Sequence, residues 1–279
     1  MPEEKPRPAW SGQFAADAIR ELDLIAPLQN ISREWAWGDS QGHGVRVAIV
    51  DSGIEHDHPV LDGCVKGGVA IEWDESVEKK VRIVEDSPPR DFCGHGTACA
   101  GVIHAIAPEA EIHSVRVLGK DLTAKALQFA AGLRWAIDAG MHVINLSLST
   151  SRAEYYALFH ELADEAYFKN ILLVSAANNF PVPSYPSLYS SVVSVAAGDS
   201  REPLTYYYNP SPPVEFGAPG IDIEVPWLNK STCVTTGNSF AAPHLTGIIA
   251  LILAKHPGLT PFHVKTLLYA CASNSQPLS

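Results

Sequence analysis

The 279-residue chain lacks the features of a membrane, secreted disulfide-rich or zinc-binding protein. Residues 1–8 are charged and proline-rich and contain no apolar signal core. No uncharged apolar run reaches the roughly 20 residues that a spanning helix needs. The five cysteines are odd in number and include no Cys-x-x-Cys pair, so neither a disulfide framework nor a zinc site is indicated. We therefore expect a reducing, cytoplasmic location and no membrane partner, with a secreted mature form as the open alternative.

Positive charge is also scarce, since 20 Lys and Arg residues stand against 31 Asp and Glu residues, a net charge of −11. This balance argues against nucleic acid as a partner. The chain is long enough for one large core or two small ones, and it shows neither an internal repeat nor a separating linker. We expect one domain over residues 26–273, a partly disordered extension over 1–25, a frayed tail over 274–279, and a monomer.

Strand-like and helix-like segments alternate along the chain. This order predicts an α/β fold with a doubly wound, mostly parallel sheet and helices on both faces, in three layers. Functional sites in such sheets lie at the carboxyl ends of the strands, where Asp51, Ser147 and Asn179 fall. The expected strands are 45–50, 112–118, 142–148 and 171–177, and the expected helices are 98–106, 127–139, 155–168, 245–253 and 260–270.

One serine stands between a glycine and a long apolar helical run, in the segment Gly237-Asn238-Ser239-Phe240-Ala241-Ala242-Pro243-His244. A serine at a helix N-terminus lies beside unpaired backbone N–H groups and in the positive end of the helix dipole. This environment suits a nucleophile whose reaction creates an oxyanion. Taken alone, Ser239 is equally well explained as a simple N-cap.

A nucleophilic serine needs a base and an orienting carboxylate, and both stand in suitable places. Asp51 ends a buried strand in Asp51-Ser52-Gly53, and His95 opens a helix in Gly94-His95-Gly96-Thr97. With the serine segment, these motifs resemble the subtilisin-like serine proteases (subtilases) in sequence and in order. The resemblance implies that Ser239 is the nucleophile, His95 the general base and Asp51 its orienting carboxylate.

The resemblance also implies an oxyanion donor and substrate-binding edges. Asn179 falls in the family's oxyanion position, with Asn178 in place of the usual Gly; an ordinary turn dipeptide is the alternative. The family binds an extended peptide between two edges, for which the matching segments here are Leu122-Thr123-Ala124 and Ser147-Leu148-Ser149.

Other departures concern metals and the neighbours of the serine. The helix after His95 runs directly into Ala107-Pro108 without the family's usual calcium loop, and Val60 stands where the family has an Asp ligand. We therefore predict no calcium at that position, no other metal site and no cofactor. Asn238 and Phe240 replace the Thr and Met that usually flank the serine. Cys99, four residues after His95, is interpreted as a buried small residue rather than a catalytic thiol.

These observations predict a serine endopeptidase that acts through an acyl-enzyme on a peptide or precursor-protein substrate, and specifically an intracellular protease that processes a precursor or leader peptide. Two alternatives remain: a peptide transamidase or macrocyclase, in which an amine replaces water, and a non-catalytic peptide-binding pseudoprotease.

Overall fold

The computed structural model describes residues 31–78 and 80–275, so the predicted extension over residues 1–25 lies outside the described residues, as do residues 276–279 of the predicted tail. The fold below is that of residues 32–275. Among the described residues, no helix combines the length and the apolar character needed to cross a membrane.

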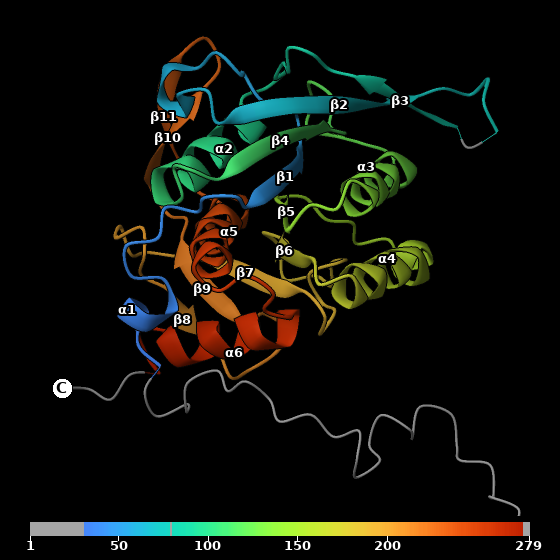
Figure 1. Cartoon of the computed structure of the whole chain (residues 1–279). Helices are drawn as coiled ribbons and strands as arrows, with labels where there is room; N and C mark the ends of the chain where they lie inside the picture. Colours follow the sequence, from blue (N-terminus) through green and yellow to red (C-terminus); the bar gives the residue numbers. More distant parts are fainter. Residues whose placement is uncertain (1–30, 79, 276–279) are drawn as a thin grey trace, which may run out of the picture. The chain divides into compact units, whose positions relative to one another are not determined.

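A nine-stranded sheet forms the middle layer (Figure 1). Strands β2, β4, β1, β5, β6, β7 and β9 run parallel, whereas β3 and β8 pair antiparallel at the two edges. In sheet order the strands are β3 (Val81–Glu85), β2 (Val65–Trp73), β4 (Glu111–Arg116), β1 (Arg46–Asp51), β5 (Val143–Leu146), β6 (Leu172–Ala176), β7 (Val193–Gly198), β9 (Phe216–Pro219) and β8 (Tyr207–Tyr208). The predicted doubly wound sheet is confirmed.

Helices cover both faces of this sheet (Figure 1). On one face lie α3 (Ala126–Asp138) and α4 (Tyr156–Phe168), which share a core with the sheet. On the other lie α2 (His95–Ile106) and α5 (Asn238–Lys255). The other helical elements are the short α1 (Arg33–Ala36), the 3-10 turns Pro59–Leu61 and Ala153–Tyr155, and α6 (Pro261–Cys271), the last helix of the described residues.

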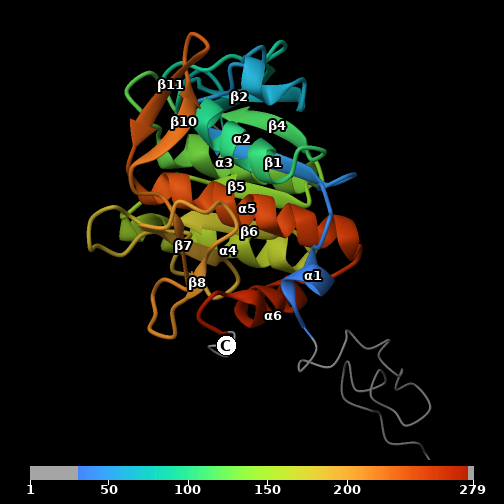
Figure 2. The same cartoon turned by 90° about the vertical axis from the view of Figure 1, so that its left-hand side faces the viewer.

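The region between β6 and α5 contains more strand than the sequence predicted. It forms β7, β8 and β9 and a separate antiparallel pair, β10 (Ile223–Trp227) with β11 (Ser231–Thr235). Figure 2 shows this pair standing beside α2. These strands are two to six residues long, and β7, β9 and β10 include glycine or proline, so tertiary pairing rather than local pattern determines them.

Two glycines allow α2 to lie close to the end of β1. A Cβ on Gly96 would stand 2.0 Å from the carbonyl oxygen of Gly53, and a Cβ on Gly53, whose φ is +104°, would stand 1.9 Å from that of Arg90. Only glycine fits at such approaches. They bring the first turn of α2, which carries His95, against the carboxyl end of β1, which carries Asp51.

Candidate active site

Asp51 and His95 form a buried pair at the carboxyl edge of the sheet. Asp51, the last residue of β1, is fully buried, and His95, the first residue of α2, is 8% exposed. The His95 Nδ1 atom lies 2.8 Å from Asp51 Oδ1 and 2.9 Å from Oδ2. Because a carboxylate only accepts hydrogen bonds, Nδ1 carries the proton and Nε2 keeps its lone pair. This is the tautomer that a general base needs.

The electrostatic setting raises the pKa of His95. Burial is the largest influence and by itself lowers the pKa, because it disfavours the charged ring. The charge of Asp51, its hydrogen bond to the ring and the more distant charge of Asp91 together outweigh burial. The site therefore stabilises the imidazolium that forms when the histidine takes a proton.

Asp91 was not singled out from the sequence, yet it organises the start of α2. Its Oδ1 accepts hydrogen bonds from Ser52 Oγ and from the N–H groups of Cys93 and Gly94, at 2.8, 3.0 and 3.0 Å. Its Oδ2 accepts from the N–H and Oγ1 of Thr97 at 2.9 and 2.6 Å. An Asp shortly before a helix is a capping signal, which could have identified it.

Ser239 is the second residue of α5, and its backbone carbonyl has an unusual partner. Pro243 lies four residues later and has no N–H to donate to that carbonyl. The oxygen instead accepts a 2.7 Å hydrogen bond from Ser147 Oγ, which in turn accepts from Asn145 Nδ2 at 3.0 Å. The proline within the helix thus frees the Ser239 carbonyl for a link to the loop after β5.

Ser239 and His95 line the same cleft, whose volume is about 260 Å³. Among the described residues no hydrogen bond joins the Ser239 hydroxyl to His95, and such bonds are often loose before substrate binds. Most of the predicted substrate-binding residues are here as well. The lining residues are His95, Leu118, Leu122, Ser147, Leu148, Ser149, Ala176, Ala177, Asn178, Asn179 and Ser239.

Two predicted substrate-binding residues, Thr123 and Ala124, are not part of this lining. Thr123 lies in a turn in which its carbonyl accepts from Gly119 N–H and its hydroxyl donates to Asp121. Ala124 packs partly against the core beneath α3. The segment 122–124 is a bend rather than a strand: Leu122 has a positive φ of 57°, and both the N–H and the carbonyl of Thr123 are bonded to nearby residues.

Asn179 follows β6 and is exposed at the cleft. Its Oδ1 accepts a 2.9 Å hydrogen bond from the backbone N–H of Asn238. A backbone N–H can only donate, so this contact identifies the side-chain oxygen and leaves the Nδ2 donor group available to the cleft.

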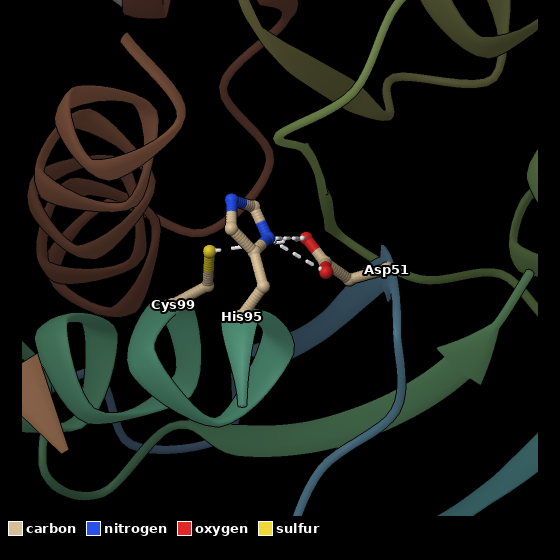
Figure 3. A group of neighbouring side chains, drawn as sticks. All are labelled: Asp51, His95 and Cys99. Atoms are coloured by element: carbon tan, nitrogen blue, oxygen red, sulfur yellow. Dashed lines mark hydrogen bonds and ion pairs between the residues drawn. The ribbon is translucent and has the colours of Figure 1, made fainter. Parts of the chain in front are cut away.

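Cys99 lies beside His95, one turn along α2 (Figure 3). Its Sγ is 3.4 Å from Ser147 Oγ, 3.7 Å from the Ser239 carbonyl oxygen and 3.9 Å from Asp51 Oδ2. Burial, followed by the charge of Asp51, raises the pKa of this thiol well above its ordinary value. A protonated thiol is a weak donor and a poor nucleophile.

Asp51, His95 and Cys99 also have the ligand types for a metal ion, since their ligand atoms all lie within 4.8 Å of one another. A metal would need a thiolate and an imidazole lone pair. In this structure the three groups are joined by hydrogen bonds: Nδ1 donates to Asp51, and the Cys99 thiol lies 3.9 Å from Asp51 Oδ2. Ring nitrogens of His56 and His58 lie 3.1 Å from the backbone oxygens of Pro89 and Ser231, respectively.

A second and larger cavity, of about 780 Å³, lies between α2 and the β10–β11 pair. None of Asp51, His95 and Ser239 borders this cavity. The chemistry of the molecule is therefore assigned to the smaller cleft, where the reactive groups converge.

Comparison with known proteins agrees with this geometry. The model of the family described as "Subtilase family" matches residues 42–278. Thermitase of Thermoactinomyces vulgaris is 31% identical over 239 residues, which cover 81% of either chain. Minor extracellular protease Epr of Bacillus subtilis is 32% identical over 263 residues, or 89% of this chain and 38% of Epr.

A solved structure is also similar. The crystal structure of a cold adapted subtilisin-like serine proteinase has a TM-score of 0.68 and 25% identity, and the match covers 85% of this chain and 87% of the other. The fold and the comparisons together define a subtilisin-like serine endopeptidase. The chain belongs to the subtilase family, which confirms the resemblance seen in the sequence.

Proposed function

We propose that this chain hydrolyses peptide bonds through an acyl-enzyme formed on Ser239. The observation that carries the proposal is the buried Asp51–His95 pair facing a cleft that Ser239 and Asn179 also line. Ser239 Oγ attacks the scissile carbonyl carbon, while His95 Nε2 takes the hydroxyl proton and then delivers it to the leaving amine. Water attacks the acyl-enzyme in the second half of the reaction, and Ser239 regains its proton.

The other groups stabilise charge during these steps. Asp51 holds the His95 tautomer and stabilises the imidazolium. The Ser239 N–H lies in the first turn of α5, where it has no acceptor within the helix, and with Asn179 Nδ2 it donates to the oxyanion. The edges around Leu122 and around Ser147, Leu148 and Ser149 border an extended peptide, which adds as a strand.

The experiment that tests the activity is the intact mass after incubation with a fluorophosphonate, on the wild-type chain and on Ser239→Ala. One adduct on the wild type and none on the variant is the expected result. A folded wild-type chain without an adduct would overturn the proposal and favour a peptide-binding pseudoprotease. Peptide products measured with and without an added amine then distinguish hydrolysis from transamidation.

The narrower role is the processing of a precursor or leader peptide in the cytoplasm. All five cysteines are free thiols, which fits a reducing compartment. The similarity to Epr argues against a cytoplasmic location, because the name of Epr describes an extracellular protease. Cell fractionation of the source organism tests the location: the protease in the medium rather than in the cell lysate would contradict the cytoplasmic proposal.

A further inference from the structure

Asn238, the residue before the proposed nucleophile, connects α5 with the segment after β6 and with strand β7. Its backbone N–H donates to Asn179 Oδ1 at 2.9 Å. Its side-chain Nδ2 donates to the carbonyls of Ala177 and Asn178 at 3.2 and 3.1 Å, and its Oδ1 accepts from the N–H of Ala197 in β7 at 2.8 Å. We call these four hydrogen bonds the Asn238 clamp.

The chemistry of the partners fixes the orientation of the Asn238 amide. Carbonyl oxygens can only accept, and the N–H of Ala197 can only donate, so Nδ2 faces the first two and Oδ1 faces the third. Both Nδ2 protons are used on consecutive carbonyls directly before Asn179. One residue therefore restrains the backbone that leads into Asn179 and also orients its side chain.

The segment that carries Asn179 needs such a restraint. Residues 179–183 are exposed. Besides the clamp, Asn178 N–H donates to Ser184 Oγ at 3.2 Å and Phe180 N–H to Asn178 Oδ1 at 2.9 Å, and the backbone N–H groups of Val182 and Ala177 donate to the carbonyls of Phe180 and Val195 at 2.7 and 2.9 Å. Loops at sheet edges are more mobile than the elements that they connect. An oxyanion donor must stand about 2.7–3.1 Å from the oxygen that it stabilises.

We propose that Asn238 is a positioning residue that sets the distance between the two oxyanion donors, Asn179 Nδ2 and the Ser239 N–H. It is covalently joined to Ser239 and clamped to Asn179. It acts through Asn179 and does not touch the reacting atoms itself. This inference rests on the proposed peptidase function.

The test uses two variants of the whole chain. Asn238→Asp keeps the size and the acceptor for Ala197, but it replaces both donors with an oxygen that faces two carbonyl oxygens. Asn238→Ala removes the side-chain bonds without adding charge. Because a displacement of about 1 Å in an active site costs about 100-fold in rate, we expect kcat to fall by about 10- to 100-fold. KM should change little, because the loss appears only when the oxyanion forms.

The inhibition constant of a peptide aldehyde is a second measurement, which general destabilisation of the fold does not change. Its adduct with Ser239 places an oxygen between the oxyanion donors, so its inhibition constant should rise in parallel with the loss of kcat. When Asn179 is already replaced by Ala, each Asn238 variant should lower kcat by less than about 3-fold further. The donor through which Asn238 acts is then absent.

The matched control is Asn209→Asp. Asn209 is exposed, donates from Nδ2 to the carbonyls of Ser211 and Val214 at 2.8 Å each, and accepts from Ser211 N–H at 3.0 Å. It reproduces the bonding pattern of Asn238 in a loop that does not border the cleft. Its substitution should leave kcat and the aldehyde constant unchanged.

Several outcomes would overturn the proposal. The Asn238 variants could lower kcat equally with and without Asn179, or leave the inhibition constant of the aldehyde unchanged. Asn209→Asp could lower kcat as much as Asn238→Asp does. Both Asn238 variants could also fail to fold, which would make the residue structural. A wild-type chain that neither hydrolyses peptides nor binds the aldehyde would remove the peptidase function itself, and the positioning role with it.

Discussion

Replacing Asp51 with Asn tests the proposed mechanism at its most buried point. The backbone N–H of Ser52 donates to Asp51 Oδ1 at 2.7 Å, so an Asn side chain keeps its oxygen there and places its NH₂ group at the Oδ2 position. That position is 2.9 Å from His95 Nδ1. The retained oxygen lies 2.8 Å from Nδ1, so the NH₂ group competes with it for that ring atom; where the NH₂ group donates, Nδ1 accepts and Nε2 carries the proton. This form cannot act as the base toward Ser239.

The expected cost is large and has a defined pH signature. A wrong tautomer of this kind lowers kcat by about 10⁴-fold, or about 5 kcal/mol of transition-state stabilisation. Asp51 raises the pKa of His95 against the lowering effect of burial. In Asp51→Asn the burial remains and the charge is lost, so the pKa of His95 falls. The rising limb of kcat/KM, which follows deprotonation of His95, should therefore move to lower pH.

The assay is kcat/KM against pH with a chromogenic peptide, for the wild type, Asp51→Asn and the control Asp138→Asn. Asp138 is exposed at the end of α3 and pairs with Lys169, so its substitution removes one negative charge outside the cleft. A loss of less than about 10-fold, or a limb that stays in place or moves to higher pH, would refute the assigned roles of Asp51 and His95.

Three further changes test neighbouring features. Asn179→Ala should lower kcat by about 10²–10³-fold at a nearly unchanged KM, measured with the same peptide, and an equal rise in KM instead would argue against an oxyanion role. Gly96→Ala should lower the free energy of unfolding by about 1–3 kcal/mol, measured by urea denaturation, because the added Cβ meets the Gly53 carbonyl at 2.0 Å; an unchanged midpoint would contradict that close approach. Cys99 is fully buried and burial raises its pKa well above the ordinary value, so iodoacetamide at pH 8 should label it only after unfolding, as read by peptide mass spectrometry. Burial also raises the pKa of the partly exposed Cys233, but to a smaller extent, so Cys233 should react in the native chain.

Local patterns were enough for the central part of the fold. The alternation of apolar strands with helices predicted β1, β4, β5 and β6 with α2, α3 and α4, because buried parallel strands are continuous apolar runs and their crossovers are helices. The β10–β11 pair was missed. Its strands are five residues each and partly exposed, and they are stabilised by pairing with each other and by packing on α2.

The candidate site, like the fold, was only partly predictable from the sequence. The motifs around Asp51, His95 and Ser239 lie at ends of strands and helices that the sequence indicated, and the structure brings them to one edge of the sheet. Asp91 and the link from Ser147 to the Ser239 carbonyl were not predicted. The link joins residues 92 positions apart in the chain, and Asp91 bonds Ser52, 39 positions away, in addition to near neighbours in the sequence.

The sequence by itself determined the family, the doubly wound fold and the residues with the right chemistry, because motifs and hydrophobic periodicity are local properties of the chain. The tertiary structure decided which atoms meet. It directs both Nδ2 protons of Asn238 to the loop before Asn179, turns the Asn179 oxygen toward α5, and leaves Thr123 and Ala124 outside the cleft lining. Hydrogen bonds between distant segments depend on orientation as well as residue type, and orientation is set only when the layers pack.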